Sequence, residues 1–377
     1  MENKRPEGLR TWIEVDKKAL VGNFNAFRNL VGEKVKILSV IKSNAYGHSL
    51  LDFASFMEDK ADWFGVDSAV EAISLRKSGI KKPILVLGFS LPEMYGFLAD
   101  NDVSFSISSF DQLEQLKKTE SQNIKKIHIK VDTGMSRQGF LDKDLPEVLN
   151  ALKDLKGVLV EGLFTHFAMA KNPAFPAFTN NQISIFKKWV EAFRKAGLNP
   201  IAHASATGGT ILYKDAHFDM VRVGIGMYGI WPSKETKEFA KDNLNLKPIL
   251  SWKTVVGEVK EISAGSKIGY DCTETVLEDS KIAVCPIGYW HGYGRVFSSV
   301  GRVLVKGEYA RILGRVSMDM IVIDVTHIKD VKALDEVVVI GTQGKNEVEA
   351  ENLADIVDIS AYELITRINP LIKRFYV

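Results

Sequence analysis

Eight short apolar runs, separated by stretches with helical spacing, constrain the fold of this chain more than any other feature of its sequence. The stretches between the runs are amphipathic, and several open with a capping Ser, Thr or Asp, as at Ala69–Lys77, Phe110–Lys118 and Ile183–Lys195. Alternation of strand and helix is typical of a parallel sheet. Eight such units in roughly 200 residues predict a closed (β/α)8 TIM barrel rather than a doubly wound sheet. The eight runs are Val35–Ile41, Trp63–Val66, Ile84–Leu87, Val103–Ile107, Ile127–Val131, Leu159–Phe164, Ile201–Ala204 and Val221–Ile225.

The pattern changes after Trp231 and Pro232, where a polar stretch leads into closely spaced strand-like runs with glycine-containing turns. These runs predict a mostly antiparallel β domain. We therefore expect an α/β chain of two domains, a barrel over residues 11–240 and a β domain over residues 241–377, with residues 1–10 as a candidate addition to the β domain. The runs are Ser251–Val259, Lys281–Cys285, Arg302–Val305, Met320–Val325 and Val337–Ile340.

Charge and composition exclude several classes of partner. Lys and Arg total 49 against 47 Asp and Glu in 377 residues, so the net charge of +2 offers no basic field for nucleic acid or an anionic membrane. No apolar run approaches the roughly 20 residues of a membrane helix. The polar N-terminal residues are not followed by the apolar segment of a secretory signal, so we expect no signal peptide. Cys272 and Cys285 lack the spacing of a metal site, and two cysteines form at most one disulfide. We expect a cytoplasmic protein with reduced thiols and no metal.

Lys42 is the first candidate catalytic residue. It directly follows the first apolar run, and barrels place their chemistry at the C-terminal ends of their strands. An isolated lysine at a strand end more often extends into solvent. Apolar flanks would instead desolvate the amine and lower its pKa, the condition for forming a Schiff base with an aldehyde cofactor.

The last barrel run and the turn before it suggest an anion site. Strand alternation puts Arg222, Gly224 and Gly226 on one face, where a buried guanidinium needs a partner and glycines let a ligand approach the backbone. The turn over residues 206–210 supplies backbone N–H groups and a hydroxyl. Barrels commonly bind phosphate between the loops after their seventh and eighth strands.

With these residues in place, the chain resembles the alanine racemases, enzymes of the fold-type III class that use pyridoxal 5′-phosphate (PLP). The resemblance runs in consistent order from Thr11 to Tyr376, and Lys42 followed by Ala45-Tyr46-Gly47-His48 is its most specific motif. It implies an isomerase that interconverts L-alanine and D-alanine and so supplies D-alanine as a peptidoglycan precursor. The family forms homodimers, which implies an active site shared between two subunits.

The resemblance also implies a role for each matching residue. Lys42 matches the lysine that binds PLP covalently and acts as one base, and Tyr270 matches the second base on the opposite face of the cofactor. Arg222 matches the arginine that donates to the pyridine nitrogen, which should stay unprotonated because arginine keeps its proton. His166 matches the histidine that lies against the cofactor ring and contacts the tyrosine.

Other matches concern the phosphate, the substrate and a modified lysine. Arg137 and Met318 match residues that contact or enclose the substrate, and Lys130 matches a lysine that is carbamylated in some members. The residues that match phosphate contacts are Tyr46, Thr207, Gly224, Ile225 and Tyr362.

Four residues depart from the family pattern around the access channel. Trp290 and His291 replace an Ala-Asp pair, Lys171 replaces a common aspartate and Ser360 a common isoleucine. These changes bear on the preference among small amino acids, so racemisation of serine or another amino acid is an alternative.

Two further alternatives come from other classes of PLP protein. A fold-type III decarboxylase shares the two-domain plan but should place a carboxylate where Arg222 stands, because decarboxylation benefits from a protonated ring. A PLP-binding protein without catalysis needs only the barrel, and the β domain that carries Tyr270 and Met318 argues against it.

Overall fold

A computed structural model of the chain describes residues 6–377. It divides the chain into two compact units. The barrel unit comprises residues 21–45 and 50–247, and the sheet unit comprises residues 6–20, Tyr46–Ser49 and Pro248–Val377. Each unit is described by itself below.

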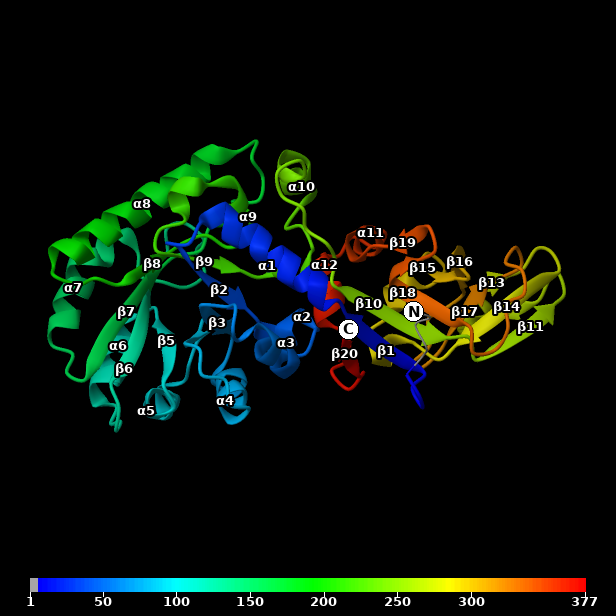
Figure 1. The fold of residues 1–377 in the computed structure, drawn as a ribbon, viewed down its shortest axis with the longest axis horizontal. Coiled ribbons are helices and arrows are strands. Elements are labelled where there is room, and N and C mark those ends of the chain that lie inside the picture. Colours follow the sequence, from blue (N-terminus) through cyan, green and yellow to red (C-terminus); the bar gives the residue numbers. More distant parts are fainter. Residues whose placement is uncertain (1–5) are drawn as a thin grey trace. The chain divides into compact units, whose positions relative to one another are not determined.

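Eight parallel strands close into a barrel in chain order, which confirms the predicted fold of the first part of the chain. Figure 1 shows the helices of this unit outside the strands. The strands are β2 (Lys36–Val40), β3 (Trp63–Val66), β4 (Ile84–Val86), β5 (Val103–Ile107), β6 (Lys125–Lys130), β7 (Val158–Phe164), β8 (Ile201–His203) and β9 (Met220–Val223).

The helices of the barrel follow the signals seen in the sequence. The side chains of Ser68 and Ser109 accept hydrogen bonds from Glu71 and Gln112 and so cap two helices. The helices of this part of the chain are α1 (Lys17–Val31), α2 (Lys42–Tyr46), α3 (Leu50–Met57), α4 (Ala69–Lys77), α5 (Tyr95–Asp100), α6 (Phe110–Lys118), α7 (Leu145–Lys153), α8 (Pro176–Lys195), α9 (Thr207–Leu212) and α10 (Lys234–Ala240).

The sheet unit is built on a mostly antiparallel sheet, as the sequence predicts. Its order is β11-β14-β17-β16-β15-β18-β10-β1-β20, with β19 against β18, and β12 and β13 form a separate pair. The bounds are β1 (Thr11–Val15), β10 (Leu250–Val255), β11 (Glu258–Ile262), β12 (Lys267–Ile268), β13 (Glu274–Thr275), β14 (Ser280–Cys285), β15 (Arg302–Val305), β16 (Glu308–Leu313), β17 (Ile321–Asp324), β18 (Glu336–Gln343), β19 (Asn346–Val348) and β20 (Arg374–Tyr376). Two helices, α11 (Ala350–Asp355) and α12 (Ala361–Thr366), complete the unit.

The first strand differs from the expectation that the barrel begins at residue 11. Thr11 is in register with Thr254 of β10, and Ile13 pairs with Arg374 of the last strand, β20, so β1 belongs to the sheet unit (Figure 1). Trp12 and Trp252 of β1 and β10 are fully buried there, which gives the physical reason for the pairing.

Residues 1–10 were expected as a possible addition to the β domain, and the structure describes residues 6–10 of this segment. Thr254 donates a hydrogen bond from Oγ1 to the Arg10 carbonyl at 2.8 Å, within the sheet unit. Residues 1–5 lie outside the described residues. In residues 6–377, every helix is too short or too polar to cross a bilayer.

Candidate active site

Lys42 directly follows β2 and opens a turn with unusual backbone geometry. Ser43, Asn44, Ala45 and Tyr46 have φ values of 55°, 57°, 51° and 51°, so four successive residues with side chains adopt the left-handed helical region. This conformation costs roughly 1–2 kcal/mol per residue for L-amino acids. Such strain concentrates at functional sites, and nothing in the sequence pattern predicted it.

Hydrogen bonds within the barrel unit hold this turn. The Ala45 amide donates to the Ile41 carbonyl at 2.8 Å, and the Asn44 amide donates to Oε1 of Glu71 at 3.3 Å. Oδ1 of Asn44 accepts from the Leu50 amide at 2.9 Å. The turn is therefore fixed on both sides, and it positions the start of the Lys42 side chain.

The amine of Lys42 lies in a more polar setting than the sequence suggested. Its side chain is 39% exposed, and Nζ donates to Oδ1 of Asp67 at 3.0 Å. The expectation that apolar flanks would desolvate this amine is therefore wrong, because Asp67 follows the neighbouring strand β3 and turns its carboxylate toward it. Asp67 is a site residue that the sequence analysis missed.

Arg222, on β9, is almost completely buried and uses four of its five N–H donors inside the barrel. Nη1 donates to Nδ1 of His203 at 2.8 Å and to the His203 carbonyl at 3.0 Å, and Nη2 donates to the carbonyls of Thr165 and Ala204 at 2.7 Å each. No described residue accepts from Nε. Burial lowers the pKa of Arg222 to about 9, which still leaves the guanidinium charged at neutral pH. The structure thus presents a fixed cation with one N–H remaining.

Phe164, the last residue of β7, supports this arrangement. Its ring stacks on the His203 imidazole at 4.9 Å and 1°, and both Arg222 and Lys130 lie 5.5 Å from its centroid. Cation–π attraction and stacking therefore hold two basic groups over one aromatic ring. His203 was also missed, although a histidine inside the apolar run Ile201–Ala204 was an available signal.

Basic side chains at the strand ends shift one another's pKa values and that of a nearby histidine. Burial and the charges of Arg137, Arg222 and Lys42 lower the pKa of Lys130 to about 8. Burial, the same three cations and Lys130 lower the pKa of His166 to about 3, so this ring is neutral at physiological pH. His166 follows β7, with Nδ1 3.4 Å from Nη2 of Arg222.

Arg137 lies on a loop organised by Asp132. Oδ1 of Asp132 accepts from the amides of Gly134, Met135 and Ser136 at 2.9, 2.8 and 3.1 Å, and Oδ2 accepts from the Arg137 amide at 3.0 Å. Burial opposes ionisation of Asp132, but these four donors outweigh it and lower its pKa. The exposed Arg137 side chain is thus carried by a fixed loop. Lys130, nearby, donates from Nζ to Gln138 at 3.0 Å.

The expected anion site of the barrel differs from the sequence prediction in one respect. β9 ends at Val223, so Gly224 and Gly226 do not share a strand face with Arg222. Gly224 precedes a 3-10 turn, η4 (Ile225–Tyr228), and Thr207 begins α9. Oγ1 of Thr207 accepts from the amides of Gly224 and Gly226 at 3.2 and 3.3 Å, which ties the two loops together.

The remaining candidate residues lie in the sheet unit. The rings of Tyr46 and Tyr362 lie 6.0 Å apart, and burial together with Tyr46 raises the pKa of Tyr362. Tyr270 and Met318 are 69% and 53% exposed. The structure thus brings Lys42, Lys130, His166 and Arg222 together within the barrel unit, whereas Tyr270 and Met318 belong to the other unit.

The residues that depart from the family pattern have local structural roles. Ser360 caps α12 by accepting from the Glu363 amide at 3.2 Å, and Nδ1 of His291 accepts from the Gly288 amide at 3.2 Å. Trp290 is 58% exposed, and Lys171 accepts hydrogen bonds through its carbonyl from Ser233 and Thr236.

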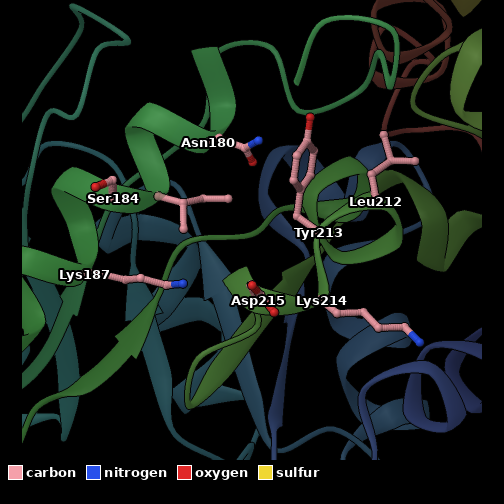
Figure 2. Close-up of a pocket in the computed structure, with 8 residues that line it drawn as sticks. Asn180, Ser184, Lys187, Leu212, Tyr213, Lys214 and Asp215 are labelled. Carbon is pink, nitrogen blue, oxygen red and sulfur yellow. The ribbon is translucent and has the colours of Figure 1, made fainter. Parts of the chain in front are cut away.

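A pocket of about 530 Å³ lies elsewhere on the barrel unit (Figure 2). Asn180, Ser184 and Lys187 of α8 line one side, and residues 212–215 line the other. None of the candidate site residues lines it. Its position on the outside of the barrel separates it from the residues at the strand ends.

Comparisons with known proteins cover nearly the whole chain. Residues 15–232 match the family described as alanine racemase, N-terminal domain, and residues 249–376 match alanine racemase, C-terminal domain. The alanine racemase of Halothermothrix orenii is 38% identical over 370 residues, or 97% of this chain and 96% of that protein. That of Methanococcus maripaludis is 36% identical over 97% and 98% of the two chains.

Solved structures of alanine racemases are similar to this chain over nearly its whole length. The alanine racemase of Clostridium difficile 630 has a TM-score of 0.91 at 31% identity, covering 99% of this chain and 97% of that one. The alanine racemase of Bacillus anthracis with bound L-Ala-P has a TM-score of 0.92 at 32% identity, covering 99% and 96%.

Proposed function

The chain belongs to the alanine racemase family of isomerases, and we propose that it interconverts L-alanine and D-alanine with PLP bound at the mouth of the barrel. The observation that carries this proposal is the set of Lys42, Arg222 and the surrounding cations at the strand ends. The product D-alanine would serve as a peptidoglycan precursor. We place the reaction in the cytoplasm, consistent with the two cysteines, Cys272 and Cys285, which are free thiols.

The side chains present fit PLP. Lys42 supplies the amine for covalent attachment, and Nε of Arg222 is a donor without a partner among the described residues. Lys42, Lys130, Arg137 and Arg222 surround the site with positive charge, as the pKa shift of His166 reflects, and this charge suits an anionic phosphate and a substrate carboxylate. Tyr46, Thr207, Gly224, Ile225 and Tyr362 would contact the phosphate.

PLP would supply an electron-withdrawing system that makes the α-proton of alanine acidic. Lys42 would handle the proton of D-alanine on one face and Tyr270 that of L-alanine on the other. Arg222 has donors and no acceptor, so it would hold the ring nitrogen in its unprotonated form. This restrains the electron withdrawal and favours prompt return of the proton over side reactions. His166, neutral beside Arg222, would orient the tyrosine base.

Substrate size follows from the residues assigned to the substrate. Arg137 would bind its carboxylate, and Tyr362 and Met318 would close the site around a methyl side chain. A pocket of this kind distinguishes one or two methylenes by only about 1–3 kcal/mol, so weaker activity with serine is expected. Lys130 would be carbamylated, and the carbamate would pair with Arg137.

We also propose a homodimer in which Tyr270 and Met318 of the partner subunit complete each site. Exposed apolar side chains support this, because contiguous apolar surface commonly marks an interface. In the barrel unit, six exposed apolar side chains follow the C-terminal ends of strands: Phe89, Leu91, Leu141, Met169, Phe175 and Phe178. In the sheet unit they include Tyr270, Tyr289, Trp290, Met318 and Met320.

Chiral chromatography of the purified protein with PLP tests the function. L-alanine and D-alanine should each convert to an equal mixture, with L-serine slower and L-lysine slowest. A rate with lysine above that with alanine would overturn the substrate assignment. Carbon dioxide release from any of these substrates would indicate the decarboxylase that shares this fold plan, although Arg222 stands where its carboxylate is expected.

A further inference from the structure

A continuous line of polar side chains runs through the barrel unit away from Arg222. Nδ1 of His203 accepts from Nη1 of Arg222 at 2.8 Å, and Nε2 of His203 lies 2.8 Å from Nδ1 of His128. Nε2 of His128 lies 3.4 Å from Oε2 of Glu161, which also accepts a short hydrogen bond from Ser104. We call these five residues the histidine relay. They come from five strands, β5 to β9.

The two ends of the relay determine where each proton lies. A guanidinium only donates, so Nδ1 of His203 must carry a lone pair and the ring proton must be on Nε2. That proton is donated to Nδ1 of His128, whose own proton is then on Nε2 and points to the carboxylate of Glu161. A carboxylate only accepts, so both ends impose the same direction.

Charge agrees with this assignment. His128 and His203 have no exposed surface, and burial lowers the pKa of both rings. Burial opposes ionisation of Glu161, but His128 and Ser104 outweigh it and lower the pKa of that carboxyl. The relay therefore holds two neutral imidazoles between a cation and an anion.

Two backbone features make room for the relay at His128. The register between β6 and β7 shifts at this point, because Ile127 pairs with Val160 whereas His128 pairs with Gly162, leaving Glu161 as an extra residue on β7. A bulge of this kind redirects a side chain. A Cβ on Gly162 would lie 2.1 Å from Nδ1 of His128, so only glycine leaves space for the ring.

We propose that Glu161, through His128, is a positioning residue that fixes the tautomer of His203 and thereby the orientation of Arg222. This inference rests on the proposed function, because its consequence is that Nε of Arg222 would be available to donate to the ring nitrogen of PLP. Arg222 itself is hydrogen-bonded to carbonyls and to His203, and Glu161 is the carboxylate at the far end of the relay. Removing that acceptor leaves a buried N–H of His128 unsatisfied and frees both rings to reverse their tautomers, which sets an N–H of His203 against Nη1.

Nitrogen NMR of the PLP-loaded protein, labelled with ¹⁵N in histidine, tests the tautomers directly. Assignment would use single His→Gln variants. We expect His128 and His203 to be neutral and protonated on Nε2 from pH 6 to pH 9. A cationic ring, or an Nδ1 proton on either residue in that range, would overturn the inference. The NMR measurement does not require turnover. If the wild-type protein does not racemise alanine, the proposed function is rejected, and the measured tautomers still test the relay independently.

Four variants separate positioning from stability. Glu161→Leu removes the acceptor and should lower kcat by on the order of tenfold, move the ¹⁵N resonance of labelled PLP and introduce the second tautomer at His203. Glu161→Gln keeps an acceptor and should recover most of kcat and most of the wild-type position of the PLP resonance. Ser104→Ala should produce a smaller change of the same kind. Ser106→Ala is the matched control, because it removes a partly buried hydrogen bond from the same strand to the Gly88 carbonyl.

Two outcomes contradict the proposal. One is that Glu161→Leu and Glu161→Gln have the same kcat and the same ¹⁵N resonance of the PLP ring. The other is an equal effect of Ser104→Ala and Ser106→Ala on the PLP resonance, which would show that the relay contributes only to packing.

Discussion

Nη1 of Arg222 donates to Nδ1 of His203 at 2.8 Å, and this single contact requires a neutral imidazole next to a buried cation. His166, 3.4 Å from Nη2, lies in the same field. The barrel unit therefore folds around histidines that cannot readily accept a second proton. These neutral histidines should make the stability of the whole chain sensitive to acid.

The chain should lose stability as the pH falls from about 6.5 toward 3. Burial and four cations lower the pKa of His166 to about 3 in the folded state, whereas an unfolded histidine titrates near 6.5. The unfolded state therefore binds more protons in this window, and the free energy of unfolding falls with pH. His166→Gln should flatten this part of the urea-midpoint profile. The exposed His327 offers the control His327→Gln, and an equal effect of the two would contradict the assignment.

Lys42→Ala should abolish covalent binding of PLP, because its amine is the one positioned at the strained turn after β2. The visible absorption of the bound cofactor should disappear, and borohydride should no longer trap a pyridoxyl group on the protein. Lys117→Ala, on a surface ion pair of α6, should retain both signals. Peptide mapping that finds the group on another lysine would reject the assignment.

Mixed dimers should show whether the site is shared. Lys42→Ala and Tyr270→Phe homodimers should each be nearly inactive. A dimer with one subunit of each kind pairs an intact Lys42 with an intact Tyr270 at one of its two sites. Random exchange should thus recover about a quarter of wild-type activity. Exchange that is verified by mass but restores nothing would place Tyr270 at its own subunit's cofactor.

Lys130 should react with carbon dioxide increasingly between pH 7 and pH 9. Burial and neighbouring cations lower its pKa to about 8, so the neutral amine, whose nitrogen attacks carbon dioxide and then loses a proton, becomes abundant over this range. A carbamate carbon signal from ¹³C-bicarbonate should appear by NMR and be absent from Lys130→Arg. Lys126→Arg, on the same strand, is the control. Persistence of the signal in Lys130→Arg would assign it to another amine.

Gly162→Ala should destabilise the chain by about 1–3 kcal/mol, because the new methyl group overlaps the ring of His128. Gly22 is the matched position, with open space around it in α1. Gly22→Ala should stabilise the chain by about 0.5–1 kcal/mol. Urea denaturation of both variants measures these changes, and equal midpoints would mean that His128 has more freedom than the structure shows.

The sequence by itself determined the elements whose signals are local. Each of the eight apolar runs became a barrel strand, because strands that are buried on both faces are rich in Val, Ile, Leu and Phe. The serines before α4 and α6 marked helix starts because their capping partners lie three residues away. Lys42 was found at a strand end because the end of an apolar run is itself visible in the sequence.

Only the tertiary structure decided the features that depend on distant partners. β1 joins the sheet because Thr11 pairs with Thr254, a residue 243 positions away. The left-handed turn at Ser43–Tyr46, the ion pair of Lys42 with Asp67 and the bulge at Glu161 each depend on neighbouring strands. Gly224 lies beyond the end of β9, in a loop whose amides donate to Oγ1 of Thr207. Periodicity describes how a segment faces its surroundings, whereas these contacts arise only once separate segments are packed together.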